Sequence, residues 1–128
     1  MRNVQDDVED FMMAADQPCN ISPAYTDEPQ ELLYMRLVEE EYNELLEAYA
    51  ARDIVETADA ICDIVWVLMG LASTLGIPFE ACWDEVRRSN MSKVVDGRLM
   101  KNPETGKVMK PEGYFSPDLE KVMFDEPK

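Results

Sequence analysis

Two groups of carboxylates in the first half of the chain have the spacing expected of metal ligands. Glu40, Glu41 and Glu44 form an EExxE pattern, and Glu56 and Asp59 form an ExxD pattern. Residues three or four positions apart lie on one face of an α-helix, so each pattern would bring its acids together. Acids this close repel one another unless a cation lies between them. Because every ligand atom would be an oxygen, these residues predict a cage for a hard cation such as Mg²⁺ or Mn²⁺.

The helix faces on which the acids fall strengthen this interpretation. Counted at about 100° per residue, Glu41 and Glu44 lie within the apolar face of their helix, and Glu40 lies at its border. Carboxylates on an apolar face are costly without a compensating cation. In the following helix, Asp63 lies on the same narrow stripe as the ExxD acids. Asp63 would either contact the residues that bind the metal or be a polar residue that caps the bundle, and the sequence leaves both open.

The elements that hold these acids are expected to be helices. Apolar periodicity predicts four of them, over residues 3–15, from 29–31 to about 52, from 53 to 76, and from 78 to about 90. The third has Asp53 as a plausible N-cap and Gly76 just past its end. It is apolar nearly all round from 60 to 75, so we expect it to be central and packed on several sides. The predicted fold class is all-α and four-helix-bundle-like.

The character of the chain changes beyond residue 92. Asp96-Gly97 and the run 102–106 are turn signals, which favour a short hairpin followed by an extended arm. We therefore expect one domain over residues 1–128, with a helical body at about 3–91 and a C-terminal arm at about 92–128.

Composition argues against several classes of function. The net charge of −15 over 128 residues argues against nucleic acid as a partner, and the absence of histidine excludes Ser-His-Asp and Cys-His catalysis and most zinc sites. The longest apolar stretch, 60–75, is too short to span a bilayer, and the first residues lack the apolar core of a signal peptide. Cys62 lies in that stretch, so buried free thiols are expected. These features predict a cytoplasmic location, in the host if the source is viral, without nucleic acid or membrane as partners.

The charges are distributed unevenly along the chain. Residues 1–86 hold 20 acids and three bases, whereas residues 87–128 hold nine bases and seven acids. A cation-loaded body with a phosphate-contacting arm would have this distribution, and so would a protein whose acids serve solubility. The basic candidates for phosphate binding are Arg87, Arg88, Lys93, Lys107 and Lys110. As a lesser alternative, the two arginines complement the C-terminal end of a helix. The last two lysines flank a turn and could equally serve solubility.

A nucleotide base would need a flat apolar pocket. The aromatic candidates include Phe11, Tyr34, Trp83 and Tyr114, although such residues are more often part of the core than of a base pocket. Trp66, on the apolar third helix, is expected to be core.

Taken together, the motifs resemble the MazG-like all-α NTP pyrophosphatase superfamily. The signature of that superfamily is ExxE, a spacer and then ExxD; here Glu41–Glu44 and Glu56–Asp59 are separated by eleven residues. The similarity is greatest to the phosphoribosyl-ATP pyrophosphohydrolase-like branch. It extends into EVRRSNMSK at 85–93 and GKVMK at 106–110.

The resemblance implies a Mg²⁺-dependent hydrolase that cleaves a nucleoside triphosphate between its α and β phosphates, releasing pyrophosphate. It implies assembly into a dimer or tetramer, with two or three metal ions per site. Glu41, Glu44, Glu56 and Asp59 would hold metal, and Glu40 would bind a further ion or position the water. Either Glu40 or Glu41 would be the general base.

The resemblance leaves the substrate open. It favours Asn90 and Lys93 as phosphate ligands. A preference for dGTP or GTP competes with one for dUTP or dCTP. The histidine-biosynthesis pyrophosphohydrolase is less favoured because the SNMSK run and the C-terminal arm depart from its pattern. A non-catalytic helical module that binds a divalent ion or a partner helix is the alternative from another class, and the intact acid stripes argue against it.

Overall fold

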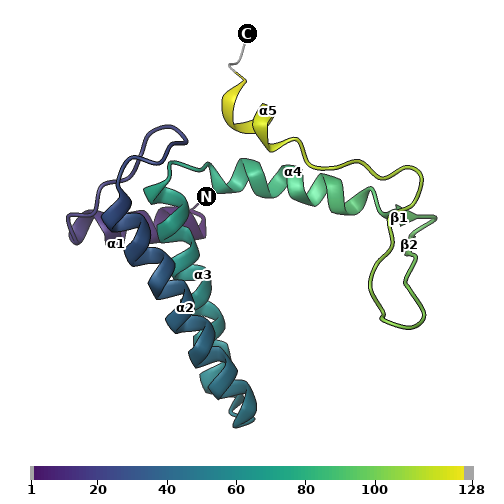
Figure 1. Cartoon of the computed structure of the whole chain (residues 1–128), viewed down its shortest axis with the longest axis horizontal. Coiled ribbons are helices and arrows are strands. Elements are labelled where there is room, and N and C mark those ends of the chain that lie inside the picture. Colours follow the sequence, from purple (N-terminus) through teal and green to yellow (C-terminus); the bar gives the residue numbers. More distant parts are fainter. Residues whose placement is uncertain (1, 126–128) are drawn as a thin grey trace. The chain divides into compact units, whose positions relative to one another are not determined.

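The computed structural model describes residues 2–125, and most of them are helical (Figure 1). Along the chain the elements are α1 (Val4–Ala14), α2 (Glu28–Ala50), α3 (Ile54–Thr74), α4 (Phe79–Met91), β1 (Val94–Val95), β2 (Arg98–Leu99) and α5 (Leu119–Phe124). The all-α fold class is therefore confirmed, and α1–α4 lie close to their predicted bounds. The sequence did not predict α5.

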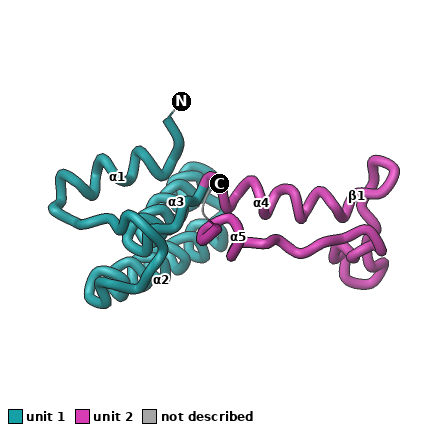
Figure 2. The backbone as a smooth tube through the Cα atoms, turned by 90° about the horizontal axis from the view of Figure 1, so that it is seen from above, with its two compact units in different colours: residues 1–79 teal, residues 80–128 magenta. Residues whose placement is uncertain are grey.

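The described chain divides into two compact units between Phe79 and Glu80 (Figure 2). The first unit contains α1, α2 and α3, and the second contains α4, the short strands and the C-terminal arm. The predicted boundary near residue 91 placed α4 in the helical body, whereas the structure groups α4 with the arm.

Side chains that cap the helices explain where α1, α2 and α3 begin. Asn3 forms a capping box with Asp6 at the start of α1. Asp27 and Asp53 accept hydrogen bonds from the backbone N–H groups of the first turns of α2 and α3. These caps satisfy donors that have no partner within the helix. Just beyond α3, Gly76 has a φ of 71°, the conformation that favours glycine after a helix.

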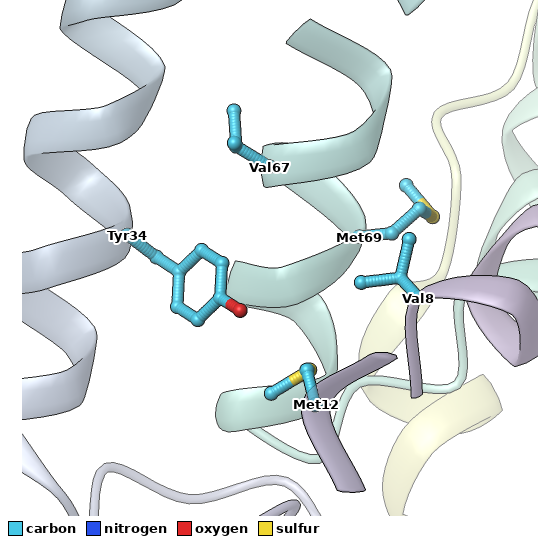
Figure 3. Packing of buried hydrophobic residues seen from close by; sticks show 5 residues of the cluster. All are labelled: Val8, Met12, Tyr34, Val67 and Met69. Carbon is cyan, nitrogen blue, oxygen red and sulfur yellow. The ribbon is translucent and has the colours of Figure 1, made fainter. Parts of the chain in front are cut away.

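The core of the first unit lies where α1 meets the paired helices α2 and α3. Figure 3 shows five buried side chains that converge there: Val8, Met12, Tyr34, Val67 and Met69. Polar contacts hold α1 in place, because the Gln5 amide donates to Ser73 Oγ and to the Ile77 carbonyl oxygen. The α2–α3 pair, which carries the acid motifs, is thus anchored by α1.

The expectation that α3 is packed on several sides is wrong for a single chain. It contacts α2 and α1, but Ile61, Val65 and Leu68 remain exposed. Trp66, expected to be core, is 38% exposed and makes an edge-to-face contact with Phe11. The apolar residues of α3 outnumber the positions that one partner helix and α1 cover, so part of the surface stays open.

The buried-thiol expectation is also wrong for two of the three cysteines. Cys19 and Cys62 are exposed, and Cys82 is buried. Cys62 is exposed for the same reason as its apolar neighbours on α3. No single helix among residues 2–125 is long and apolar enough to cross a membrane, and α3 meets that test only when taken together with α4.

In the second unit, the chain leaves α4 through two turns and then returns along it (Figure 2). Asp96 and Gly97 form the turn between β1 and β2, in which Val94 pairs with Leu99. A bridge between Lys101 and Val108 closes the second predicted turn. The predicted hairpin and arm are therefore present.

Hydrogen bonds hold the returning arm on α4. Ser89 Oγ donates to the Phe115 carbonyl oxygen at 2.8 Å, and the Phe115 N–H donates to Ser92 Oγ at 3.2 Å. Farther along, the Asp118 N–H donates to Glu85 Oε2 at 2.7 Å. Glu85 also forms an ion pair with Arg88, which explains how α4 accommodates a buried carboxylate.

Candidate metal centre

Three carboxylates from two helices meet between α2 and α3. Glu41 and Glu44 lie one turn apart on α2, and Asp63 lies on α3. Each offers one oxygen, and the three oxygens lie within 4.8 Å of one another. The spacing of the two acids on α2 brings them to one face, and the packing of α3 against α2 adds the third. We call these three residues the carboxylate cluster.

Glu41 is the member of the cluster whose environment is least favourable to charge. Its Oε2 atom is buried and has no hydrogen-bond partner among the described residues. Burial raises the pKa of Glu41 to about 7, with further contributions from its hydrogen bond to Glu44 and from the charges of Glu44, Asp63 and Asp59. The pKa of Asp63 is raised too, first by burial and then by Asp59 and Glu44. The cluster therefore concentrates negative charge that no described side chain neutralises.

The remaining predicted ligands lie beside the cluster. Glu56 and Asp59 line a hollow of about 400 Å³ between α2 and α3, and Glu44 lines the same hollow. Ala48 and Ala60 lie in its wall, so small side chains leave the space open. Glu44 thus belongs to both the carboxylate cluster and the hollow. The structure brings four of the five predicted metal ligands into this region.

Glu40, the fifth, is exposed and lies outside the carboxylate cluster. Three acids of this region were not among the predicted ligands. Asp63 proves to be a member of the cluster, and Glu47 and Asp53 line the hollow. The sequence did carry a signal for Asp63 and Glu47: Asp63 follows Asp59 by four residues, and Glu47 follows Glu44 by three, so each continues an acid stripe.

The chemistry of the cluster fits a divalent cation. Oxygens bound to one Mg²⁺ or Ca²⁺ lie at about 2.0–2.6 Å from it and thus at most about 4–5 Å from each other. The oxygens of Glu41, Glu44 and Asp63 meet that limit. The buried Glu41 Oε2 has no hydrogen-bond partner among the described residues. Binding a metal ion would satisfy this oxygen.

The second unit holds the predicted phosphate ligands, in three separate places. Arg87 and Asn90 line a small pocket of about 230 Å³ on α4 together with Trp83. Lys93 instead lies over the ring of Tyr114, with its Nζ 5.7 Å from the ring centroid. Lys107 is exposed beside the 102–106 turn.

The predicted base-pocket aromatics occupy three different environments. Tyr34 is 3% exposed, and its hydroxyl donates to Gln17 Oε1, so its ring belongs to the core. Phe11 is half-exposed and contacts Trp66. Trp83 is exposed beside Arg87. The first two lie in the first unit and Trp83 lies in the second.

Comparison with known families decides the identity of this helical scaffold. The sequence pattern of the phosphoribosyl-ATP pyrophosphohydrolase family matches residues 8–90, which is most of the chain and includes the whole α2–α3 pair. The chain belongs to this family. The resemblance to the MazG-like all-α superfamily is thereby confirmed, because the family is part of it. Membership of the phosphoribosyl-ATP pyrophosphohydrolase family identifies a pyrophosphohydrolase that acts on a nucleotide. A search of curated proteins gave no match.

Proposed function

We propose that the protein is a Mg²⁺-dependent nucleoside triphosphate pyrophosphohydrolase. The observation that carries this proposal is the meeting of Glu41, Glu44 and Asp63 between two helices of the pyrophosphohydrolase fold. Hydrolysis of a phosphoanhydride needs charge compensation and an activated water, and an all-carboxylate cluster is suited to the metal that provides both.

The residues that would hold the metal are the carboxylate cluster and, across the hollow, Glu56 and Asp59. Bound Mg²⁺ would offset the charge of the phosphates and lower the pKa of a nearby water. Glu44 belongs to both groups, and the acids together would hold two or three ions per site. Mn²⁺ would substitute, since it accepts the same oxygen ligands.

The chain's own acids account for the proton transfer. Water attacks the α-phosphorus, a new P–O bond forms, and the bond to the α–β bridging oxygen breaks. Pyrophosphate leaves with the electron pair, and a carboxylate accepts the proton of the water. Glu40 is exposed and outside the carboxylate cluster, so its oxygens are free to take that proton, whereas those of Glu41 are committed within the cluster. This favours Glu40 over Glu41 as the base.

Substrate contacts are proposed for the second unit. Arg87, Asn90, Lys93 and Lys107 are the proposed phosphate contacts, and Trp83 is the aromatic candidate best placed for a base, because it is exposed in a pocket with Arg87 and Asn90. Where the base stacks on Trp83, Arg87 in the same pocket would contact the base instead of a phosphate, because arginine pairs readily with the O6 and N7 acceptors of guanine. This supports a preference for dGTP or GTP over dUTP or dCTP.

We also propose that the active form contains two or four copies of the chain. The α2–α3 pair exposes apolar side chains that a single chain does not cover, among them Leu46 and Tyr49 on α2 and Ile61 and Leu68 on α3. A second copy would bury this surface and so remove the unfavourable free energy of exposing it to water. Sedimentation velocity across a concentration series tests this, and a monomer at all concentrations would contradict it.

We place the enzyme in the cytoplasm, without nucleic acid or membrane as partners.

Pyrophosphate release from each canonical dNTP and NTP, dUTP and phosphoribosyl-ATP tests the reaction and names the substrate. We expect release from a guanine nucleotide with Mg²⁺ and none after chelation with EDTA. Release from phosphoribosyl-ATP alone would overturn the triphosphate assignment while keeping the family's reaction. Calorimetry separates the enzyme from a metal-binding module: an enzyme should bind Mg²⁺ far better in the presence of a non-hydrolysable nucleotide analogue.

A further inference from the structure

Two lysines that are far apart in the sequence lie on the same aromatic ring of the second unit. The Nζ of Lys93 is 5.7 Å from the centroid of the Tyr114 ring, and the Nζ of Lys110 is 5.0 Å from it. Lys93 lies two residues beyond the end of α4, and Lys110 lies just after the second turn of the arm. We call Lys93, Lys110 and Tyr114 the Tyr114 cluster.

The backbone around the Tyr114 cluster is held firmly. The Phe115 N–H and carbonyl oxygen bond to Ser92 and Ser89, so the residue next to Tyr114 is fixed to α4. The Met109 N–H donates to the Met100 carbonyl oxygen at 2.7 Å, which fixes the strand segment that precedes Lys110. The convergence of the two lysines is therefore a product of the folded arm.

The positive charge of the cluster is not balanced by the protein. Among residues 2–125, neither the Lys93 nor the Lys110 ammonium group forms an ion pair with a carboxylate. The C-terminal end of α4 carries roughly half a negative charge, about a quarter of what two ammonium groups would require. The cluster is thus a local excess of positive charge on a chain whose net charge is −15.

The groups in the cluster are those that bind phosphate. Each ammonium group has three N–H donors, and the phenol of Tyr114 can donate one more hydrogen bond. The pKa of Tyr114 lies below its usual value, chiefly because of hydrogen bonds with Ser116 and Ser89, and the charges of Lys110 and Lys93 lower it by smaller amounts. A lowered phenol pKa makes the hydroxyl a stronger hydrogen-bond donor.

We propose that Lys93, Lys110 and the Tyr114 hydroxyl bind the phosphate chain of the nucleotide substrate. The identification of the ligand as a nucleotide rests on the proposed function, whereas the anion site rests on the cluster alone. Sequence spacing did not reveal the use of Lys110, because only the folded turn brings Lys110 to the same ring as Lys93.

Binding of inorganic tripolyphosphate in EDTA tests the anion site without metal or turnover. Isothermal calorimetry of the whole chain would compare wild type with Lys110→Gln and with Lys101→Gln, a matched loss of charge at an exposed lysine of the same arm. We expect Lys110→Gln to weaken binding about tenfold or more, as for a lost hydrogen bond to a charged group. The Lys101→Gln change should weaken it by less than about twofold, as for a screened surface charge. Equal effects of the two changes, or no binding by wild type, would overturn the proposal.

Two further variants identify the ligand and guard against misfolding. Lys110→Arg keeps the charge and should retain most of the binding, which a general loss of structure would not allow. Glu44→Gln should lose pyrophosphate release but bind tripolyphosphate as wild type does, so failure of the proposed function and failure of this inference give different results. Lys110→Gln should also raise the KM for the nucleotide more than it lowers kcat. An unchanged KM with weakened tripolyphosphate binding would show that the site takes another phosphate and would overturn its assignment to the substrate.

Discussion

A carboxylate oxygen of Asp63 on α3 lies within 4.8 Å of one of Glu41 on α2. Among residues 2–125, no arginine or lysine side chain forms an ion pair with either acid. Two acids from different helices at this distance destabilise the helix pair unless a cation joins them. The ExxD motif predicts Glu56 and Asp59 as the ligands from α3, but the structure brings Asp63 to within 4.8 Å of Glu41 and Glu44 of the EExxE motif. Metal binding and stability are therefore coupled at this contact.

The first prediction concerns Asp63 itself. Asp63→Asn should lower pyrophosphate release by about 100-fold or more, because it removes a ligand from the carboxylate cluster. It should also raise the Mg²⁺ concentration needed for half-maximal rate. The matched control is Glu39→Gln, an exposed acid on α2. Full activity of Asp63→Asn at ordinary Mg²⁺ concentrations would show that Asp63 only caps the helix pair.

The second prediction concerns stability without metal. In EDTA, Glu41→Gln should raise the midpoint of thermal unfolding by about 2 °C or more, since it removes one of the mutually repelling acids and leaves the packing nearly unchanged. Mg²⁺ should stabilise wild type and have little effect on the variant. Circular dichroism melts with and without Mg²⁺ provide the measurement. A variant less stable than wild type in EDTA would mean that Glu41 makes a favourable contact in the metal-free protein.

The third prediction follows from the raised pKa of Glu41. In the folded protein this pKa is about 7, against an ordinary value of 4.5, so the folded state binds the proton more tightly than the unfolded state. The metal-free wild type should therefore lose stability relative to Glu41→Gln as the pH rises from about 4.5 to 7. Above pH 7 the difference should stay constant. Urea unfolding in EDTA at a series of pH values measures this difference in the free energy of unfolding. A difference that shrinks as the pH rises would contradict the repulsion between Glu41 and its neighbouring acids.

The fourth prediction concerns the arm, whose stability should fall as the pH is lowered and not as it is raised. The pKa of Glu85 is lowered to about 2, mainly by its hydrogen bond with Arg88 and then by that from the Asp118 N–H. Its stabilisation of the arm is present above the ordinary pKa of 4.5 and should be lost as the pH falls from about 4.5 to 2. At pH 7, Glu85→Gln should speed hydrogen exchange at the Asp118 amide. Equal exchange in wild type and the variant would show that Glu85 does not hold the arm.

The fifth prediction tests the packing that positions α2 on α3. A Cβ at Gly70 would overlap the Tyr34 ring, which belongs to the core. Gly70→Ala should destabilise the protein by about 1–3 kcal/mol through overpacking, outweighing the gain of up to about 1 kcal/mol in helix propensity. Gly113→Ala, where nothing lies within 4 Å, is the control and should change little. A more stable Gly70→Ala would mean that the Tyr34 ring can move away.

Much of the fold could be predicted from the sequence because its signals are local. Asp53 and Gly76 mark the ends of α3 through capping and a positive φ, both of which depend on neighbouring residues only. The same holds for the Asp96-Gly97 turn. By contrast, α5 is only six residues long, which is too short for a periodic pattern to be recognised.

The site was only partly predictable because its composition depends on how helices pack. Helical spacing groups Glu41 with Glu44, but it cannot say whether Asp59 or Asp63 of α3 comes closest to them, since both lie on the same stripe. That choice depends on the axial offset between α2 and α3. The exposure of Trp66 and Cys62 likewise depends on how many neighbours a single chain supplies, which an apolar pattern does not encode.

The most direct test of the central claim is the rate of pyrophosphate release from the preferred nucleotide with Mg²⁺, measured for wild type, Glu44→Gln and Glu39→Gln in parallel. Glu44 belongs both to the carboxylate cluster and to the hollow, whereas Glu39 is an exposed acid on the same helix. We predict equal rates for wild type and Glu39→Gln, with equimolar nucleoside monophosphate and pyrophosphate as products, and no measurable rate for Glu44→Gln. Turnover by Glu44→Gln close to that of wild type would contradict the assignment of the active site to this cluster.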